Sequence, residues 1–347
     1  MGDFKYQHLI EIFIFLEFFI VLFFVILAYF LYLYIRIKQK LDTKRSHEID
    51  ALFLQMDIKG ELMQLPYKKH VHLLIETFMA WDKAHKDSQN WQRYHVELMK
   101  EQILPAASHY IKSRNWTKRF WLLECLDYYM DQNYETILIK LINDPFSIIS
   151  IGSTHIAIRF GSRRVLQSLL DKICLEEGHF QVLYISQLTS TPILYTLIEE
   201  KLIMSQEAHA RESCYRILAE IGAKREFYNF AVNDVDSTNL ELKLAAIRLL
   251  SDTNPEAATP ILIALLKHPN WLVRNAAIRG MAHLKNNAII PYVIEACNDS
   301  TWWVRVNAAK ILAQFESPDQ NDALTQELAA FQEPQYFLKI REIKKHK

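Results

Sequence analysis

Apolar and polar residues recur with a fixed period in the C-terminal third of the chain. Four positions hold the same residue type 31 residues apart, namely Pro260 and Pro291, Val273 and Val304, Arg274 and Arg305, and Ala277 and Ala308. Such a coincidence is the signature of a structural repeat. In each copy a proline opens a first helix, a polar turn follows, and a second helix begins at a tryptophan. Each helical hairpin leaves an apolar face that only a neighbour can cover, so the pattern predicts a stack of hairpins.

Weaker copies of the repeat precede the two clear ones. Lys243 and Ala246 occupy the arginine and alanine positions one period upstream. Another period earlier the apolar spacing persists, but Tyr215 takes the place of the alanine. The alanine matters because a small side chain lets the helices of neighbouring hairpins pack closely. The copies therefore predict that the stack continues upstream with more varied contacts between its helices.

Helical periodicity extends back to about residue 91, which predicts about seven hairpins in an all-α solenoid over residues 91–331. The expected helices pair as 91–112 with 114–130, 134–142 with 147–160, 163–175 with 179–189, and 192–203 with 206–221. We expect the first helix to break at Pro105 and Gly161 to end a helix in a left-handed conformation. A last helix is expected at 319–331, followed by a basic tail at 332–347.

The repeat pattern resembles HEAT repeats in their short bacterial form. The resemblance covers residues 256–316 and is carried by Trp271, Val273, Arg274 and Ala277 in one copy and by Asp299, Trp303, Val304, Arg305, Ala308 and Ala309 in the next. It implies an α-solenoid with an extended curved surface that recognises partners. The sequence of residues 302–309 also resembles that of anchored HEAT proteins that accompany family 2 membrane glycosyltransferases. This narrower resemblance implies such an enzyme as the partner.

A long apolar segment stands at the other end of the chain. Residues 18–35 carry no charge, and residues 9–17 extend the run with only Glu11 and Glu17 charged. Eighteen helical residues cover about 27 Å, so residues 9–35 predict a transmembrane helix. The segment lacks the basic start and the small-residue cleavage site of a signal peptide. Glu17 either lies shallow and reaches outward, or pairs with a polar group of another membrane helix.

Basic residues follow the apolar segment and set its expected orientation. Five of them stand directly behind it, against Lys5 in front: Arg36, Lys38, Lys40, Lys44 and Arg45. The positive-inside rule predicts a single-pass protein of the inner (cytoplasmic) membrane, with the N-terminus outside and the rest in the cytoplasm. Residues 36–90 are expected to form a juxtamembrane helical segment, with a solvent loop at 81–90. This basic stretch and the tail at 332–347 are expected to lie on anionic lipid, although a solvated terminus explains the tail equally well.

Composition narrows the chemistry further. Only 7 of the 347 residues are Gly and 10 are Pro, which favours helix throughout. Lys and Arg balance Asp and Glu at 40 each, so total charge does not argue for nucleic acid. The four cysteines are scattered singly, and His70 and His72 are two apart on an expected helix, where they face away from each other. We expect no metal, no cofactor and no catalytic residue, because the common catalytic and phosphate-binding motifs are absent.

The candidate contact residues come from the repeats and the membrane helix. Arg274 and Arg305 either form a ladder that binds a ligand or bond to turn carboxylates and carbonyls between stacked hairpins. Trp271, Trp302 and Trp303 are either partner anchors or plain packing residues, and adjacent Trp302 and Trp303 cannot both point inward. Glu17 adds a candidate contact within the membrane.

These observations favour a membrane-anchored scaffold that binds an integral membrane protein and catalyses no reaction. Two other functions stay open. The first is an enzyme, since HEAT-like solenoids include bilin lyases and alkylpurine DNA glycosylases. The second is a lipid-sensing or signal-sensing module that uses the basic segments.

Overall fold

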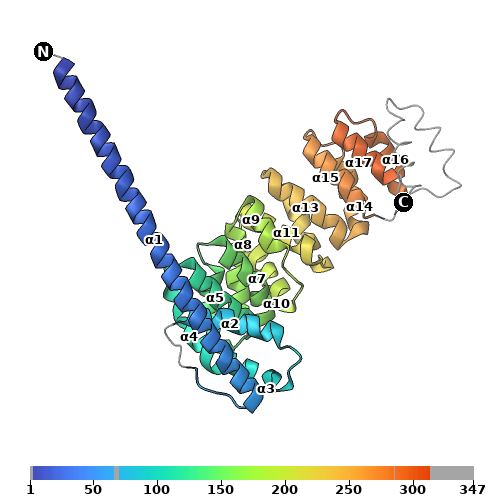
Figure 1. Ribbon diagram of the computed structural model, residues 1–347. Helices are drawn as coiled ribbons and strands as arrows, with labels where there is room; N and C mark the ends of the chain where they lie inside the picture. Colours follow the sequence, from blue (N-terminus) through green and yellow to red (C-terminus); the bar gives the residue numbers. More distant parts are fainter. Residues whose placement is uncertain (1–2, 66–69, 285, 313–347) are drawn as a thin grey trace, which may run out of the picture. The chain divides into compact units, whose positions relative to one another are not determined.

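The computed structural model describes residues 3–65, 70–284 and 286–312, with side chains from Phe15 onward. All regular structure in these ranges is helical, which confirms the predicted all-α class (Figure 1). The contacts divide the chain into two compact units, residues 1–131 and 132–347. The predicted boundary at residue 90 between juxtamembrane segment and solenoid stays a prediction, and residues 91–131 lie in the first unit.

The first unit is built around one long helix. Its helices are α1 (Asp3–Lys59), α2 (Val71–Ala84), α3 (Gln89–Leu98), α4 (Leu104–Ala107) and α5 (Trp116–Tyr128). The predicted membrane segment lies inside α1, which continues without a break through the residues expected as helix or linker. From Phe15 onward, this helix is long and apolar enough to cross a membrane, although a signal sequence near the N-terminus has the same properties.

The C-terminal part of α1 belongs to the core of the first unit. Ile49, Phe53 and Met56 are buried, as their helical spacing predicts. The ring of Phe53 lies 6.0 Å from that of Trp81 and 5.5 Å from that of Trp91. The predicted solvent loop at 81–90 is therefore too long: α2 continues to Ala84, α3 begins at Gln89, and the loop is confined to residues 85–88. The polar residues around the two indoles hid the apolar surface that these rings bury.

Pro105 interrupts the helix expected at 91–112, as predicted. Its missing N–H leaves the carbonyl of Glu101 without the usual helical donor. The chain responds with a π-helical turn at Met99–Ile103, in which the N–H of Leu104 donates to the carbonyl of Met99, five residues earlier. A 3₁₀ turn at Ser108–Lys112 then ends the segment.

The described part of the second unit contains six helical hairpins. They pair α6 (Glu135–Ile142) with α7 (Ser147–Phe160), α8 (Arg163–Leu175) with α9 (Gly178–Ile185), α10 (Pro192–Met204) with α11 (Ala208–Ile221), α12 (Tyr228–Asp234) with α13 (Leu240–Thr253), α14 (Pro255–Leu265) with α15 (Trp271–Met281), and α16 (Ile290–Ala296) with α17 (Trp302–Leu312). The hairpins predicted from residue 134 onward are confirmed, although α9 ends at Ile185 and not at residue 189. The hairpin predicted from 91–112 and 114–130 lies in the first unit, and its first helix is interrupted. Gly161 ends α7 with φ of 68°, which an L side chain rarely adopts. The predicted helix at 319–331 and tail at 332–347 lie outside the described residues.

The twelve helices form two layers. The first helices of the hairpins make one layer, and the second helices α7, α9, α11, α13, α15 and α17 make the other (Figure 1). Each second helix packs directly against the next along the whole array, whereas from α10 onward neighbouring first helices touch less. This part of the array therefore curves with its second helices on the inner side.

Two sequence expectations about the clear repeats have different outcomes. Ala277 and Ala308 are fully buried, as expected for the residues that allow close helix packing. Pro260, however, does not open a first helix, because α14 already begins at Pro255. Asn254 caps this helix by accepting a hydrogen bond from the N–H of Ala257 at 3.4 Å, so the Asn-Pro pair supplies an earlier start.

Candidate functional site on the second-helix face

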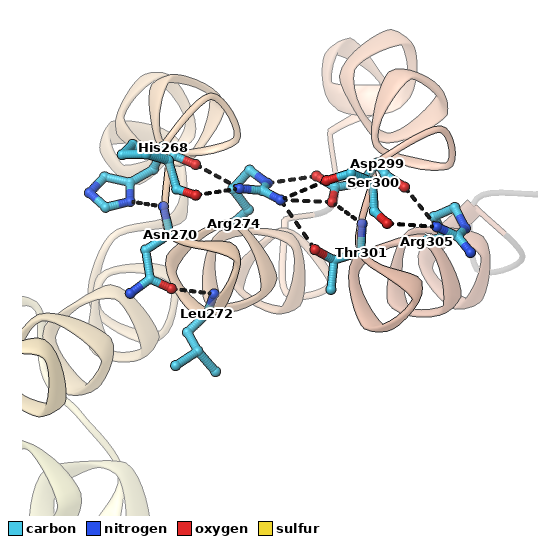
Figure 2. Close-up of polar contacts among 9 residues, drawn as sticks. His268, Asn270, Leu272, Arg274, Asp299, Ser300, Thr301 and Arg305 are labelled. Carbon is cyan, nitrogen blue, oxygen red and sulfur yellow. Dashed lines mark hydrogen bonds and ion pairs between the residues drawn. The ribbon is translucent and has the colours of Figure 1, made fainter.

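Arg274 links two consecutive hairpins. Its Nε and Nη2 donate to the two carboxylate oxygens of Asp299 at 2.6 and 2.9 Å, across to the turn between α16 and α17 (Figure 2). Its Nη1 donates to the carbonyls of His268 and Pro269, at 2.9 and 3.0 Å, in the turn that precedes α15. One guanidinium thus holds its own turn and that of the next hairpin, with the bidentate geometry typical of arginine and carboxylate.

Arg305 repeats part of this arrangement one period later. Its Nη1 donates to the carbonyls of Asp299 and Ser300 at 2.9 and 3.2 Å (Figure 2). For Arg274 the structure therefore realises the alternative in which the side chain bonds to turn groups between stacked hairpins. The bonds of Arg305 to these two carbonyls lie in the turn of its own hairpin, so Arg305 holds that turn, and Arg274 joins two hairpins.

The structure adds an arginine that the sequence analysis missed. Arg211 on α11 donates from Nε to Asp234 at 2.9 Å and from Nη1 to the carbonyls of Leu202 and Ser205. These contacts match those of Arg274, since they join the preceding turn to an aspartate of the next hairpin. The hydroxyl of Tyr215 donates to the same Asp234 carboxylate.

Arg211 corrects the repeat alignment. The buried alanine stands three residues after the linking arginine in the clear repeats, and three residues after Arg211 stands the fully buried Cys214. The earlier alignment, in which Tyr215 replaces the alanine, is therefore wrong by one residue. The connection between α11 and α13 absorbs one extra residue, so that the local period from Cys214 to Ala246 is 32. An arginine three residues before a small buried residue is the signal that would have found it.

Electrostatics favours the charged form of the Arg274–Asp299 link. Burial alone would raise the pKa of the Asp299 carboxyl, but hydrogen bonds from Arg274 and from the N–H of Thr301 outweigh burial and hold that pKa below its usual value. The pKa of Arg274 is raised by its hydrogen bond to Asp299. Both groups therefore stay ionised near neutral pH, and the link is a hydrogen-bonded ion pair.

The exposed inner surface of the second helices, called here the second-helix face, carries a groove of about 520 Å³ that runs from α9 to α15. Side chains from α9, α11, α13 and α15 line this groove, among them Val182, Arg216, Leu244, Arg248, Leu272 and Arg279. The Glu212 side chain at its floor is nearly buried and pairs with Arg216 at 2.6 Å. The groove therefore combines apolar patches with charges of both signs, as recognition surfaces in proteins commonly do.

The predicted tryptophans are exposed on the turn side of the array. Trp271, Trp302 and Trp303 keep 37, 39 and 55 % of their surface exposed, and the rings of the adjacent pair lie edge to face at 4.5 Å. Neither of the pair points inward, because the fully buried Val304 takes the core position. Trp303 stands 31 residues after Leu272, which lines the groove, so Trp303 is the one that continues the second-helix face onto α17.

The comparisons with known proteins cover the same region. The family model of HEAT repeats matches residues 228–299 and 259–334, a range that includes the Arg274–Asp299 link. The C-terminal part of the chain is a HEAT-repeat array. The chain is also similar to the crystal structure of YibA from Escherichia coli, at 18 % identity over 62 % of this chain and 82 % of that chain, with a TM-score of 0.37. Among curated proteins, none matches this chain significantly.

Glu17 and the histidine pair belong to the first unit. Glu17 is exposed on the apolar part of α1, in the first unit. The rings of His70 and His72 lie 6.4 Å apart, and within the described ranges no three His, Cys, Asp or Glu side chains gather as metal ligands. Cys125, Cys174 and Cys214 are buried.

Proposed function

We propose that the protein is a membrane-anchored scaffold whose HEAT-repeat array binds an integral membrane protein in the cytoplasm. The observation that carries the proposal is the continuity of α1. Its apolar residues from Phe15 to Ile37 are exposed except for the half-buried Leu33, and the same helix enters the core of the first unit at the buried Ile49. A helix that is exposed and apolar in one half and packed in the other fits an anchor better than a leader that is removed.

The helical connection also supports a spacer function. Ser46, ten positions after Arg36 at the end of the apolar run, already forms a hydrogen bond with Thr77 of α2 at 3.0 Å. At 1.5 Å per residue, these ten positions place this first contact about 15 Å along the helix from the membrane surface. Tethering at this distance raises the effective concentration of the array near a membrane-bound partner. The basic residues at 36–45 favour contact with anionic lipid and support the proposal that the array lies in the cytoplasm, behind a single helix in the inner membrane.

The second-helix face is the proposed contact surface. In this proposal Trp271, Trp302 and Trp303 supply exposed aromatic anchors, while Arg274 and Arg305 hold the hairpins that carry them. Glu17 offers a further contact with a polar group inside the membrane. A family 2 glycosyltransferase is the narrower candidate partner and rests on the resemblance of residues 302–309. HEAT-repeat proteins are in general not enzymes, and the proposal assigns this chain no reaction.

Crosslinking in intact membranes tests the scaffold. The tagged full-length chain is captured after crosslinking, and the proteins bound to it are identified and quantified. We expect one integral membrane protein in near-stoichiometric amount, reduced at least about 10-fold by Trp302→Ala with Trp303→Ala, since truncated aromatic anchors cost about 2 kcal/mol or more of binding. Tyr292→Ala is the matched control, because Tyr292 is exposed on α16 in the other layer of the same hairpin.

Three results would count against parts of the proposal. Equal recovery from the double variant removes the two tryptophans from the interface. Absence of any stoichiometric membrane partner, together with turnover of a small molecule by the purified chain, favours the enzyme instead. For topology, cytoplasm-dependent and periplasm-dependent reporters are fused separately to residue 347, and activity of the periplasmic reporter alone would overturn the assigned orientation.

A further inference from the structure

A row of cations crosses the second-helix face. Arg211, Lys243, Arg274 and Arg305 hold equivalent positions in four consecutive repeats. Five residues after each of them, a basic side chain stands on the same second helix: Arg216 on α11, Arg248 on α13, Arg279 on α15 and Lys310 on α17. The corrected register through Arg211 brings Arg216 into this row. The first three side chains line the groove, and Lys310 is exposed on the next helix.

The cations become more available toward the C-terminal end of the row. Arg216 is already neutralised, since it lies 2.6 Å from Glu212 and 4.0 Å from Glu241. Arg248, Arg279 and Lys310 are exposed, and the described part of the chain shows no ion pair for any of them. The sequences of α15 and α17 contain no Asp or Glu. The face is therefore positive where it approaches the exposed Trp303.

The spacing of the row selects a particular kind of ligand. Neighbouring packed helices lie about 8–10 Å apart, and each presents one cation. A peptide in the polyproline II conformation repeats its facing side chain every third residue and advances about 9 Å in that distance. In a β-strand, side chains alternate between two faces, so a side chain three residues after one that faces the row would point away from it. Carboxylates at every third position of a polyproline II segment would each meet one cation.

We propose that an extended acidic segment of the partner crosses α13, α15 and α17, with a carboxylate at every third residue facing Arg248, Arg279 and Lys310 and an apolar side chain against Trp303. This inference rests on the proposed scaffold function and names the chemistry of its ligand. A peptide fits better than a nucleic acid, because a short acidic segment confined to α13, α15 and α17 avoids Glu212 and Glu220 on α11. A nucleic acid that continued along the groove would bring its phosphate backbone against these carboxylates.

Peptide binding to the full-length chain in detergent micelles tests the proposal. Two fluorescent 12-residue peptides have the same composition of glutamate, proline and one leucine, but only one has glutamate at every third position. We expect fluorescence anisotropy to show at least about 10-fold tighter binding of the regularly spaced peptide, weakening as salt increases. The variant with Arg248→Ala, Arg279→Ala and Lys310→Ala should lose this preference.

A charge-matched control separates the row from total charge. The variant with Lys140→Ala, Arg225→Ala and Lys267→Ala loses three exposed cations outside the second-helix face and should keep the preference. Equal binding of the two peptides, no binding of either, or tighter binding of a 12-residue oligothymidylate would overturn the proposal. Crosslinking then separates the two hypotheses: a membrane partner recovered equally with the row variant rejects the acidic segment and keeps the scaffold, whereas no partner with the unaltered chain rejects the scaffold.

Discussion

The two compact units reach stability by different means. In the first unit, four helices contribute one aromatic ring each, from Phe53, Phe78, Trp91 and Tyr128, with centroid distances of 5.0 to 6.3 Å between contacting rings. No spacing recurs among these residues. In the hairpins of the second unit, the same link between an arginine, two preceding carbonyls and the aspartate of the next hairpin occurs at Arg211 and at Arg274. A single core couples all its helices, whereas a repeated link couples only neighbours.

The largest expected effect tests the single core. Phe53→Ala removes a fully buried ring that contacts α2 and α3, and should cost about 3–5 kcal/mol of unfolding free energy. Hydrogen exchange should rise throughout α1–α5 while α13–α17 keep their protection. Leu54→Ala, at an exposed neighbouring position, is the control and should change little. Equal loss of protection in both units would show that they unfold together.

A smaller effect tests the repeated link. Arg274→Ala leaves the largely buried Asp299 carboxylate and two carbonyls without their donor, at a cost of about 3 kcal/mol. The loss of hydrogen-exchange protection should be confined to α14–α17. Arg279→Ala on the same helix lacks such contacts and should stay within about 0.5 kcal/mol. If both variants lose the same stability in urea unfolding, the link is not a main contact between these hairpins.

Overpacking tests the close helix contact that the alanine allows. Ala308→Leu adds three carbons at a fully buried position and should cost about 1–3 kcal/mol. Lys310→Leu places the same side chain at an exposed position of α17 and serves as the control for helix propensity. Thermal melting of the two variants should therefore differ. A melting temperature for Ala308→Leu equal to that of the unaltered chain would reject the assigned register.

The smallest effect concerns pH. The pKa of Asp299 is held below its ordinary value of 3.8, so its ionised form stabilises the folded array above that pH. This contribution should be fully present at neutral pH and lost as pH falls below about 4 through the lowered pKa. Hydrogen exchange in α14–α17 at pH 6, 4 and 3 measures it. Asp299→Asn should be less stable at pH 6 and show a weaker dependence, and an unchanged pH dependence would exclude this carboxylate as its source.

Several elements could be predicted from the sequence because their signals are local. The bounds of α7 and α8 agree with the prediction, since Asn143, Pro145, Gly161 and Ser162 mark their ends through turn and cap chemistry. The long apolar helix that contains residues 9–35 could be predicted from composition, because its uncharged run is local. The burial of Ala277 and Ala308 and the bonding of Arg274 and Arg305 to turn groups were also accessible, because a repeated hairpin places equivalent residues in equivalent surroundings.

Other features depended on tertiary contacts. A polar neighbourhood suggested a loop around Trp81, yet its indole packs near Phe53, 28 positions earlier in the chain. The extra residue before α13 does not disturb the helical periodicity on either side, so only the contacts of Arg211 showed that Cys214 holds the alanine position. The alignment of Arg216, Arg248, Arg279 and Lys310 likewise requires neighbouring helices to be packed in register. Periodicity specifies the face of one helix, and packing alone decides which faces of different helices form one surface.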